Sequence, residues 1–526
     1  MRTLFTNGEI WCSRGTYTEA ILVEAGKIVA LGEKANNSAY DEKVDLGGKF
    51  LAPGFIDAHA HPLFAGRESQ GPNVSGLQSV DEIVAAVSVY IQKHPEAGWV
   101  IGGAYEASLI PGGDYEAAAL DKASRDIPIV LHAVDHHTIW VNTKALERAG
   151  ITSATVDPDG GTIARYNDGS PKGTLREPSA IDLILTCTPQ RTLEDDVAAI
   201  GWACQRYLES GVTSATDAWV EPGMPEAYME ADRRSALTID TNLFFLAQPD
   251  TWRSHSDDFV KFRKEIEAFP STSHLSAKTI KFICDGALSA GTAALLEPYL
   301  DNQSSTGLLI WDEAELIAAM VHFDALGFQI HTHAIGDAAI RQALNAIEVV
   351  TKTNPQWDRR PVIAHAQLIH PDDLPRFASL NVIANIQPLW TYLDPMNEKL
   401  IAPRIGKHRN DRQYQLASLQ RSGARISYGS DWPVTSHIPL EALAVPTHRS
   451  APGSNNAWSP QESISIEDSL VHYTQDAAYS NFWNKGVIAV GADADFVVLD
   501  QNPLTVDPKL VSEIEVLQVF VDGVKV

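Results

Sequence analysis

Two histidines separated by one residue follow a short apolar run near the start of the chain. The run passes through Leu51, Phe55 and Ile56 and ends in His59-Ala60-His61. Because side chains alternate between the two faces of a β-strand, His59 and His61 would point the same way if this run is a strand. Neutral imidazole is a common ligand of zinc and related metals, so the pair predicts part of a metal site. The alternative from the tripeptide alone is a loop with two exposed histidines.

Further residues that could hold a metal stand within or at the ends of other apolar segments. They are Lys281, His333, His365 and Asp431. Each has an ordinary explanation when taken singly: a hydrogen-bonded histidine, an aspartate that caps a helix, or a lysine whose stem is buried while its ammonium reaches water. Barrel enzymes place their chemistry at the carboxyl ends of strands. The joint occurrence of these residues in strand order therefore favours a metal site.

The middle of the chain alternates strand-like and helix-like segments, which is typical of a parallel α/β architecture. After the first run, the predicted strands are 213–217, 241–246, 279–283, 327–333, 361–365, 382–387 and 425–431. Predicted helices at 312–325, 337–350 and 371–380 fit between them. The total of about eight strands is the number that a TIM barrel needs.

Both ends of the chain contain short strand-like runs separated by glycine turns. We predict that residues 1–54 and 485–526 pair into one small β-sandwich domain and that residues 55–484 form the barrel; separate flaps are the alternative. Residues 66–195 are too long for an ordinary connection between strands, and they contain a helix at 79–93 and a strand at 127–132. We expect this insertion to cover the pocket, since loops at this face of a barrel carry substrate contacts.

The overall composition is that of an ordinary soluble globular protein, with 44% hydrophobic and 21% charged residues among 526. The net charge of −26, from 41 basic and 67 acidic residues, argues against nucleic acid or an anionic membrane as a partner. Four widely spaced cysteines without a CxxC motif argue against a disulfide framework. We find no signal peptide and no apolar run near the roughly 20 residues of a membrane span, so we expect a cytoplasmic protein.

Eight motifs follow one another along essentially the whole chain. They are 53–61, 135–142, 173–177, 281–286, 333–337, 365–367, 429–433 and 489–499. In this set the sequence resembles the amidohydrolase superfamily, and most closely its family 3 branch, which includes N-substituted formamide deformylase-like proteins. The resemblance implies an α/β fold: a distorted TIM (β/α)8 barrel with a small β-sandwich domain formed from both termini.

The resemblance also implies one or two divalent metals, with zinc as the expected ion. The first metal would be held by His59, His61 and Asp431, and the second by His333 and His365. Lys281 would bridge both as an Nζ-carboxylated lysine, because a free ammonium cannot ligate a cation whereas a carboxylate made from lysine and CO₂ can. An uncarboxylated Lys281 beside a single metal is the alternative.

Four further residues bear on the site. Glu177 is a rival acidic ligand, but it lies in the insertion, so we assign it to the substrate pocket with His137 and Trp140. Ordinary packing is the alternative for Trp140. His331 precedes His333 by two residues and would face the same way, as a substitute or extra ligand. The resemblance implies that a single-metal deaminase of the superfamily would carry a glutamate shortly after His333; none follows it here, which weakens that interpretation.

These features predict a metal-dependent hydrolase that cleaves a C–N bond of an amide, N-formyl or cyclic amide compound through a metal-activated hydroxide. Asp431 would accept the proton of the water and pass it to the leaving amine, and His137 would stabilise the developing oxyanion. An ester or lactone hydrolase and a non-catalytic binding or regulatory protein are the alternatives. The expected partner is a small-molecule substrate, not nucleic acid or a membrane, and a homodimer stays open.

Overall fold

The computed structural model describes residues 1–134, 136–270 and 272–526. Asp135, the first residue of one of the motifs above, lies outside the described residues. The chain forms two compact units. The first comprises Met1–Pro62, Gly201–Trp432 and Ser436–Val526, and the second comprises Leu63–Ile200 and Pro433–Thr435. Within the described ranges, no helix is both long and apolar enough to cross a membrane.

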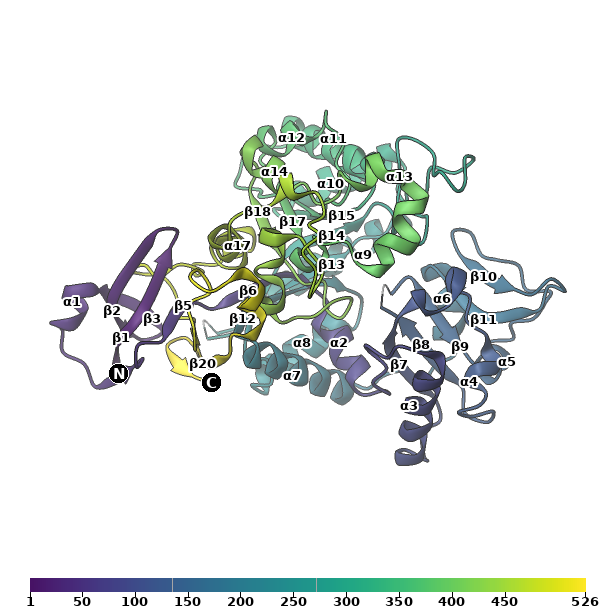
Figure 1. Cartoon of the computed structure of the whole chain (residues 1–526), viewed down its shortest axis with the longest axis horizontal. Coiled ribbons are helices and arrows are strands. Elements are labelled where there is room, and N and C mark those ends of the chain that lie inside the picture. Colours follow the sequence, from purple (N-terminus) through teal and green to yellow (C-terminus); the bar gives the residue numbers. More distant parts are fainter. Residues whose placement is uncertain (135, 271) are drawn as a thin grey trace. The chain divides into compact units, whose positions relative to one another are not determined.

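A sheet of eight strands, counted over the described residues, forms the centre of the first unit (Figure 1). In spatial order the strands are β6 (Phe55–Ala60), β12 (Val212–Val220), β13 (Asp240–Leu246), β14 (Leu275–Ile283), β15 (Gln329–Ala334), β16 (Val362–His365), β17 (Ile383–Ile386) and β18 (Ile426–Tyr428). Neighbouring strands pair in parallel, and most of their side chains are buried, as in parallel sheets covered on both faces. The sequence prediction of a barrel is confirmed.

Backbone hydrogen bonds join the carboxyl end of the first barrel strand, β6, to the segment that follows the last strand, β18. The backbone N–H of Asp431 donates to the carbonyl oxygen of His59 at 2.7 Å, and that of His61 donates to the carbonyl oxygen of Trp432 at 2.7 Å. Gly429 lies so close to β6 that a Cβ there would stand 2.5 Å from the backbone nitrogen of His59, which only glycine avoids. The first and last strands of the barrel are thereby brought together at their carboxyl ends.

Helices alternate with the strands along the chain. They are α7 (Leu193–Glu209), α8 (Met224–Arg233), α9 (Trp252–Glu267), α10 (Glu313–Ala325), α11 (Asp337–Thr353), α12 (Leu374–Ser379), α13 (Ala402–Asn410), α14 (Leu416–Ser422), α15 (Pro439–Ala442), α16 (Val445–His448), α17 (Ile466–Tyr473) and α18 (Gln475–Ser480). The start of α10 shows why a helix begins at this point of the sequence: the Asp312 side chain accepts hydrogen bonds from the N–H groups of Ala314 and Glu315. Gly327, with φ +77°, follows its end. The three helices predicted from sequence are α10, α11 and α12.

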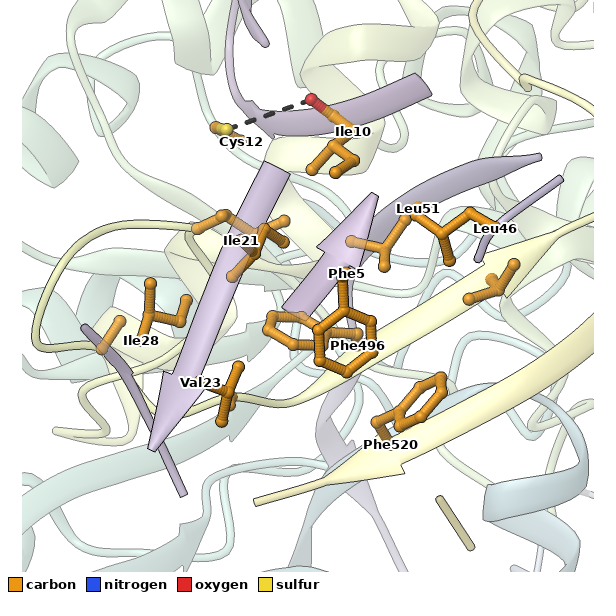
Figure 2. Close-up of a cluster of buried hydrophobic side chains, with 14 residues drawn as sticks. Phe5, Ile10, Cys12, Ile21, Val23, Ile28, Leu46, Leu51, Phe496 and Phe520 are labelled. Atoms are coloured by element: carbon orange, nitrogen blue, oxygen red, sulfur yellow. Dashed lines mark hydrogen bonds between the residues drawn. The ribbon is translucent and has the colours of Figure 1, made fainter. Parts of the chain in front are cut away.

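The two ends of the chain form one further sheet. Its order is β21 (Val524–Lys525), β20 (Val516–Val521), β19 (Phe496–Leu499), β5 (Phe50–Pro53), β1 (Arg2–Ser13), β2 (Thr16–Glu24) and β3 (Lys27–Leu31), with β4 (Glu42–Asp45) beside β1 and a short helix α1 (Gly32–Asn36) after β3. Antiparallel pairing of β19 with β5 joins the two ends. Figure 2 shows the apolar side chains of this sheet, where the ring of Phe5 makes edge-to-face contacts with Phe496 and Phe520, at 5.4 and 5.0 Å between centroids. The core of the sheet thus contains residues from both termini.

A buried lysine connects this terminal sheet to the barrel. The ammonium of Lys485 donates to the carboxylates of Asp495, at 2.5 Å, and of Asp240, and to the hydroxyl of Ser214 at 3.2 Å. Asp240 and Ser214 lie on barrel strands, whereas Asp495 immediately precedes β19. Burial alone would lower the pKa of Lys485, but the two carboxylates raise it above its ordinary value.

Most of the second unit, Leu63–Ile200, is inserted in the chain between β6 and β12. In its sheet the strands follow the order β10 (Thr162–Arg165), β11 (Pro171–Arg176), β9 (Thr138–Val141), β8 (Ile129–Ala133) and β7 (Val100–Tyr105). Its helices are α2 (Pro62–Ser69), α3 (Val80–Lys93), α4 (Ala117–Leu120), α5 (Thr143–Arg148) and α6 (Pro178–Leu185). The first residue of α2, Pro62, is the last residue of the preceding segment of the first unit. The predicted helix at 79–93 is α3, whose N-terminus is capped by the side chain of Ser79, and the predicted strand at 127–132 is β8.

Candidate metal centre

Six of the predicted site residues stand at the carboxyl ends of barrel strands. His59 lies on β6 and His61 just after it, Lys281 on β14, His333 on β15, His365 at the end of β16, and Asp431 shortly after β18. All but His61 are at most 9% exposed. Because parallel strands end at one rim of a barrel, the fold gathers these side chains from residues that are far apart in sequence.

The two histidines of the opening motif both face one carboxylate oxygen. Oδ1 of Asp431 lies 3.0 Å from Nε2 of His61 and 3.4 Å from Nε2 of His59. The expectation that His59 and His61 point the same way agrees with this geometry. Burial alone would raise the pKa of the Asp431 carboxyl, but its contacts with the two imidazoles hold that pKa well below its ordinary value. Asp431 is therefore a carboxylate across the physiological range.

One group of ligand atoms is especially compact. His59, His365 and Asp431 each offer an atom that lies within 4.8 Å of the other two, and all three side chains are buried. Burial lowers the pKa of His365 to about 4 and that of His59 well below its ordinary value. Both imidazoles are therefore neutral at pH 7, which is the form that binds metals. The resemblance assigned His365 to a second metal, whereas the structure groups it with the residues of the first.

The remaining histidine of the set lies beside His365. The rings of His333 and His365 are 4.5 Å apart between centroids, and Nε2 of His333 is 3.4 Å from the carbonyl oxygen of Gly286. On the other side, the ring of Trp390 stacks on His365 with an angle of 4° between the planes. Nδ1 of His365 is 2.8 Å from Oε1 of Gln387, so that nitrogen carries the hydrogen and Nε2 keeps its lone pair.

The lysine predicted as a bridging ligand is buried among these groups. Nζ of Lys281 lies 3.5 Å from Nε2 of His59, and the side chain is 2% exposed. Burial lowers the pKa of Lys281 to about 7, against an ordinary value of 10.5. A large fraction of this amine is therefore neutral at physiological pH, as a lysine that reacts with CO₂ or lies beside a cation must be.

These residues fit a divalent metal in the nature of their donor atoms. Neutral imidazole nitrogens and a carboxylate oxygen are the ligands that zinc takes in proteins. Buried charges in proteins are normally paired or coordinate metals, and the cluster brings Asp431 and the lone pairs of His59 and His365 to one place. Of the six residues predicted as ligands, His59, His365 and Asp431 form the compact group that could hold a metal. His61 and Lys281 have nitrogens 3.0 Å from Oδ1 of Asp431 and 3.5 Å from Nε2 of His59, and the ring of His333 lies beside that of His365.

Two polar residues that were not predicted as site residues, Gln387 and Asp57, support this part of the barrel. Gln387 holds His365, as described above, and follows directly on the apolar strand β17, so a polar residue at a strand end was the available signal. Asp57 lies two residues before His59 within β6 and is 2% exposed. An acidic residue inside an apolar run was its signal. His331, predicted as an extra ligand, has its Nε2 2.9 Å from Nδ1 of His59.

Two of the predicted substrate-binding residues pair with each other in the second unit. Nδ1 of His137 lies 2.9 Å from Oε2 of Glu177. Glu177 adopts φ +65°, outside the regions that most residues prefer, and it immediately precedes α6. Backbone strain of this kind persists where the surrounding structure fixes it, often at functional sites. The pair therefore remains a candidate for substrate contact, with the carboxylate orienting the imidazole.

Trp140, the third predicted substrate-binding residue, lies in the hydrophobic core of the second unit. Trp140 is fully buried, its indole N–H donates to the carbonyl oxygen of Glu116 at 3.0 Å, and its ring packs against Tyr105 and Tyr115. This favours the packing alternative for Trp140, because a fully enclosed indole with its donor satisfied has no surface left for a substrate.

Comparison with known proteins decides the family. Residues 42–526 match the family model described as "Amidohydrolase family". The chain belongs to the amidohydrolase family. The chain is 30% identical to protein LONG AFTER FAR-RED 3 of Arabidopsis thaliana, over 99% of the present chain and 90% of the relative. It is 26% identical to the N-substituted formamide deformylase of Arthrobacter pascens, over 97% and 95% of the two chains.

A solved structure supports the barrel fold of this chain. An uncharacterized metal-dependent hydrolase from Pyrococcus horikoshii OT3 aligns with a TM-score of 0.77 and 24% identity, over 97% of the present chain and 99% of the other. At that identity the likeness shows the fold alone. The family-model match and the deformylase relative confirm the resemblance to the family 3 branch that the motifs indicated.

Proposed function

We propose that this amidohydrolase is a metal-dependent enzyme that hydrolyses a C–N bond of a small amide, N-formyl or cyclic amide compound. The observation that carries the proposal is the compact group of His59, His365 and Asp431 at the carboxyl ends of barrel strands. A relative over nearly the whole chain is named N-substituted formamide deformylase, which supports this class of substrate. The preferred ion is zinc, because the ligand set is rich in imidazole.

A divalent metal, when bound, lowers the pKa of water toward about 7 and polarises a carbonyl group. The protein's part is to position and to move protons. Asp431 is buried, ionised and aimed by His59 and His61, so its carboxylate is placed to accept a proton from the attacking water and to return it to the leaving amine. His137, oriented by Glu177, is proposed to donate a hydrogen bond to the developing oxyanion.

Lys281 is proposed to act as an Nζ-carboxylated ligand. The reaction of a neutral amine with CO₂ forms an N–C bond and releases one proton, which leaves a carbamate with a single negative charge. The lowered pKa of Lys281 supplies the neutral amine that this reaction needs. An unmodified lysine beside a single metal is the alternative, and mass spectrometry of the intact protein under mild conditions distinguishes them by one CO₂.

The proposal is tested with Asp431→Asn. We expect kcat on N-formyl and N-acyl amines to fall by about 10³-fold, in line with the loss of a positioned acid–base group. Zinc content, measured by elemental analysis, separates loss of the base from loss of the metal. Asp372→Asn is the matched control, since its side chain is 82% exposed. Undiminished turnover in Asp431→Asn contradicts the assignment.

Two alternatives have their own discriminating measurements. Ester or lactone hydrolysis would use the same residues, so a substrate panel that pairs each amide with its ester analogue separates the two. A non-catalytic binding or regulatory role predicts that the purified protein holds no metal under non-chelating conditions. The chemically competent set of ligands argues for catalysis.

A further inference from the structure

A second histidine lies directly against the first ligand of the metal centre. Nδ1 of His59 and Nε2 of His331 are 2.9 Å apart, and the two rings lie 5.0 Å apart between centroids, with 28° between their planes. Both side chains are at most 1% exposed. The hydrogen bond is therefore shielded from water and holds the ring of His59 in one orientation.

The strand register explains how His331 reaches this place. His331 is two residues before His333 on β15 and pairs with Lys281 of β14. Side chains two apart in a strand share a face, so His331 faces the barrel interior one step deeper than His333. From there its ring approaches His59 from the side away from Asp431, whose Oδ1 lies 3.4 Å from the other ring nitrogen of His59.

The direction of this hydrogen bond follows from the number of protons available. Nε2 of His59 faces Asp431 and Lys281, at 3.4 and 3.5 Å, so it is the nitrogen that would ligate a metal. A neutral imidazole has one N–H, which must then be on Nδ1 and must donate to Nε2 of His331. The proton of His331 is in turn on its own Nδ1, a buried atom with no hydrogen-bond partner among the described residues.

We propose that His331 is a positioning residue, which accepts the Nδ1 hydrogen of His59 and so fixes the tautomer and ring orientation of that ligand. The inference rests on the proposed function, because it needs a metal at Nε2 of His59. His331 does not itself serve as a ligand: its Nε2 is engaged by His59, and its ring packs against Phe244 at 4.7 Å between centroids. Partners of this kind orient ligating histidines in metal proteins generally.

The same chain holds its other central ligand in an analogous way. Nδ1 of His365 lies 2.8 Å from the amide oxygen of Gln387, so both imidazoles of the compact group donate to a neutral acceptor. A carboxylate acceptor would add negative charge and make the ligand more basic. Neutral acceptors leave more of the positive charge on the metal. The analogy also identifies the conservative replacement: a glutamine at position 331 can offer the oxygen that Gln387 offers to His365.

The test compares His331→Gln with His331→Phe. We measure the zinc dissociation constant by competition with a chromophoric chelator, and the fold of the metal-free proteins by circular dichroism. His331→Phe is expected to weaken zinc binding by about 10- to 100-fold, the usual effect of removing such a partner, whereas His331→Gln should stay within about threefold of the parent. Thr332→Val is the matched control, since Thr332 is on the same strand, is buried, and has a hydroxyl with no partner among the described residues.

A measurement on the unmodified protein covers the case in which a variant does not fold. In the zinc form labelled with ¹⁵N-histidine, His331 is expected to show a protonated Nδ1 and an unprotonated, metal-free Nε2. A metal-shifted nitrogen on His331, equal zinc affinities for His331→Phe and the parent, or equal losses in both variants would overturn the inference. Absence of zinc from the parent protein would instead overturn the proposed function.

Discussion

The carboxylate of Asp57 holds Ser430 by two hydrogen bonds: Oδ1 accepts from the backbone N–H of Ser430 at 2.8 Å, and Oδ2 accepts from its hydroxyl at 2.5 Å. Oδ2 also accepts from the hydroxyl of Tyr207 at 3.1 Å. Asp57 is on the first barrel strand, and Ser430 precedes Asp431 after the last one. The contact therefore places the carboxylate of Asp431 opposite the histidines of β6.

We expect Asp57→Ala to destabilise the protein and to impair metal binding together. The substitution removes the acceptor of three hydrogen bonds, two from Ser430 and one from Tyr207, which costs roughly 3 kcal/mol in the free energy of unfolding at about 1 kcal/mol for each bond. Urea unfolding of the metal-free protein measures this loss, and chelator competition measures zinc affinity. Ser430→Ala removes only the hydroxyl and should show a smaller loss of both. A stable variant with unchanged zinc affinity would contradict this role.

The buried amine of Lys281 predicts a specific pH dependence of the metal-free protein. Its pKa is about 7 in the folded state and near the ordinary 10.5 when unfolded. Between these values the unfolded state binds more protons, so this group makes the free energy of unfolding rise as the pH increases from about 7 to 10.5. Lys281→Met should remove that rise. The free energy of unfolding of the parent, taken relative to that of the variant, should therefore increase between about pH 7 and 10.5; a constant difference would refute the lowered pKa.

The ion pairs around Lys485 support the fold rather than the chemistry. Lys485→Met leaves Asp240 and Asp495 buried without their cation, so we expect a loss of about 3–5 kcal/mol in the free energy of unfolding. Lys27→Met is the matched control, because Lys27 is half exposed in its ion pair with Asp493, and its loss should stay below about 1 kcal/mol. Chemical denaturation measures the free energy of unfolding of both variants. The amount of zinc bound per folded molecule should be unchanged in each variant. A loss of stability in Lys27→Met as large as that in Lys485→Met would contradict the interpretation.

We expect substitutions of the paired residues His137 and Glu177 to lower kcat/KM without changing the zinc content. His137→Gln should lower kcat/KM by about 10²-fold, as expected for a group that stabilises an oxyanion, with zinc content unchanged. Glu177→Gln should act in the same direction through the orientation of His137. Trp140→Phe, by contrast, should reduce stability while KM is maintained, since Trp140 belongs to the core. Loss of zinc in Glu177→Gln would instead identify Glu177 as a ligand.

The features of this protein that can be predicted from its sequence are those determined by neighbouring residues in the chain. An apolar run that ends in a histidine or an aspartate identifies both a strand and its carboxyl end, as it does for His59, His365 and Asp431, whereas Lys281 stands out as a charged residue within an apolar strand. The supporting contacts were not predictable. Asp57 meets Ser430 across 373 positions because the barrel closes there. Nor does the spacing of His331 and His333 show that one of them turns its ring toward His59 rather than toward a metal.

Closure of the barrel between β6 and β18 also determines when the centre can exist during synthesis. His59 and His61 leave the ribosome early, but the segment that carries Asp431 and bonds to them is made far later. At about 5–20 residues per second, the two histidines wait on the order of 20–70 seconds for that partner. A nascent chain released before residue 431 keeps the imidazoles but has no carboxylate to complete the group, so the proposed metal centre would be completed only late in the synthesis of this polypeptide.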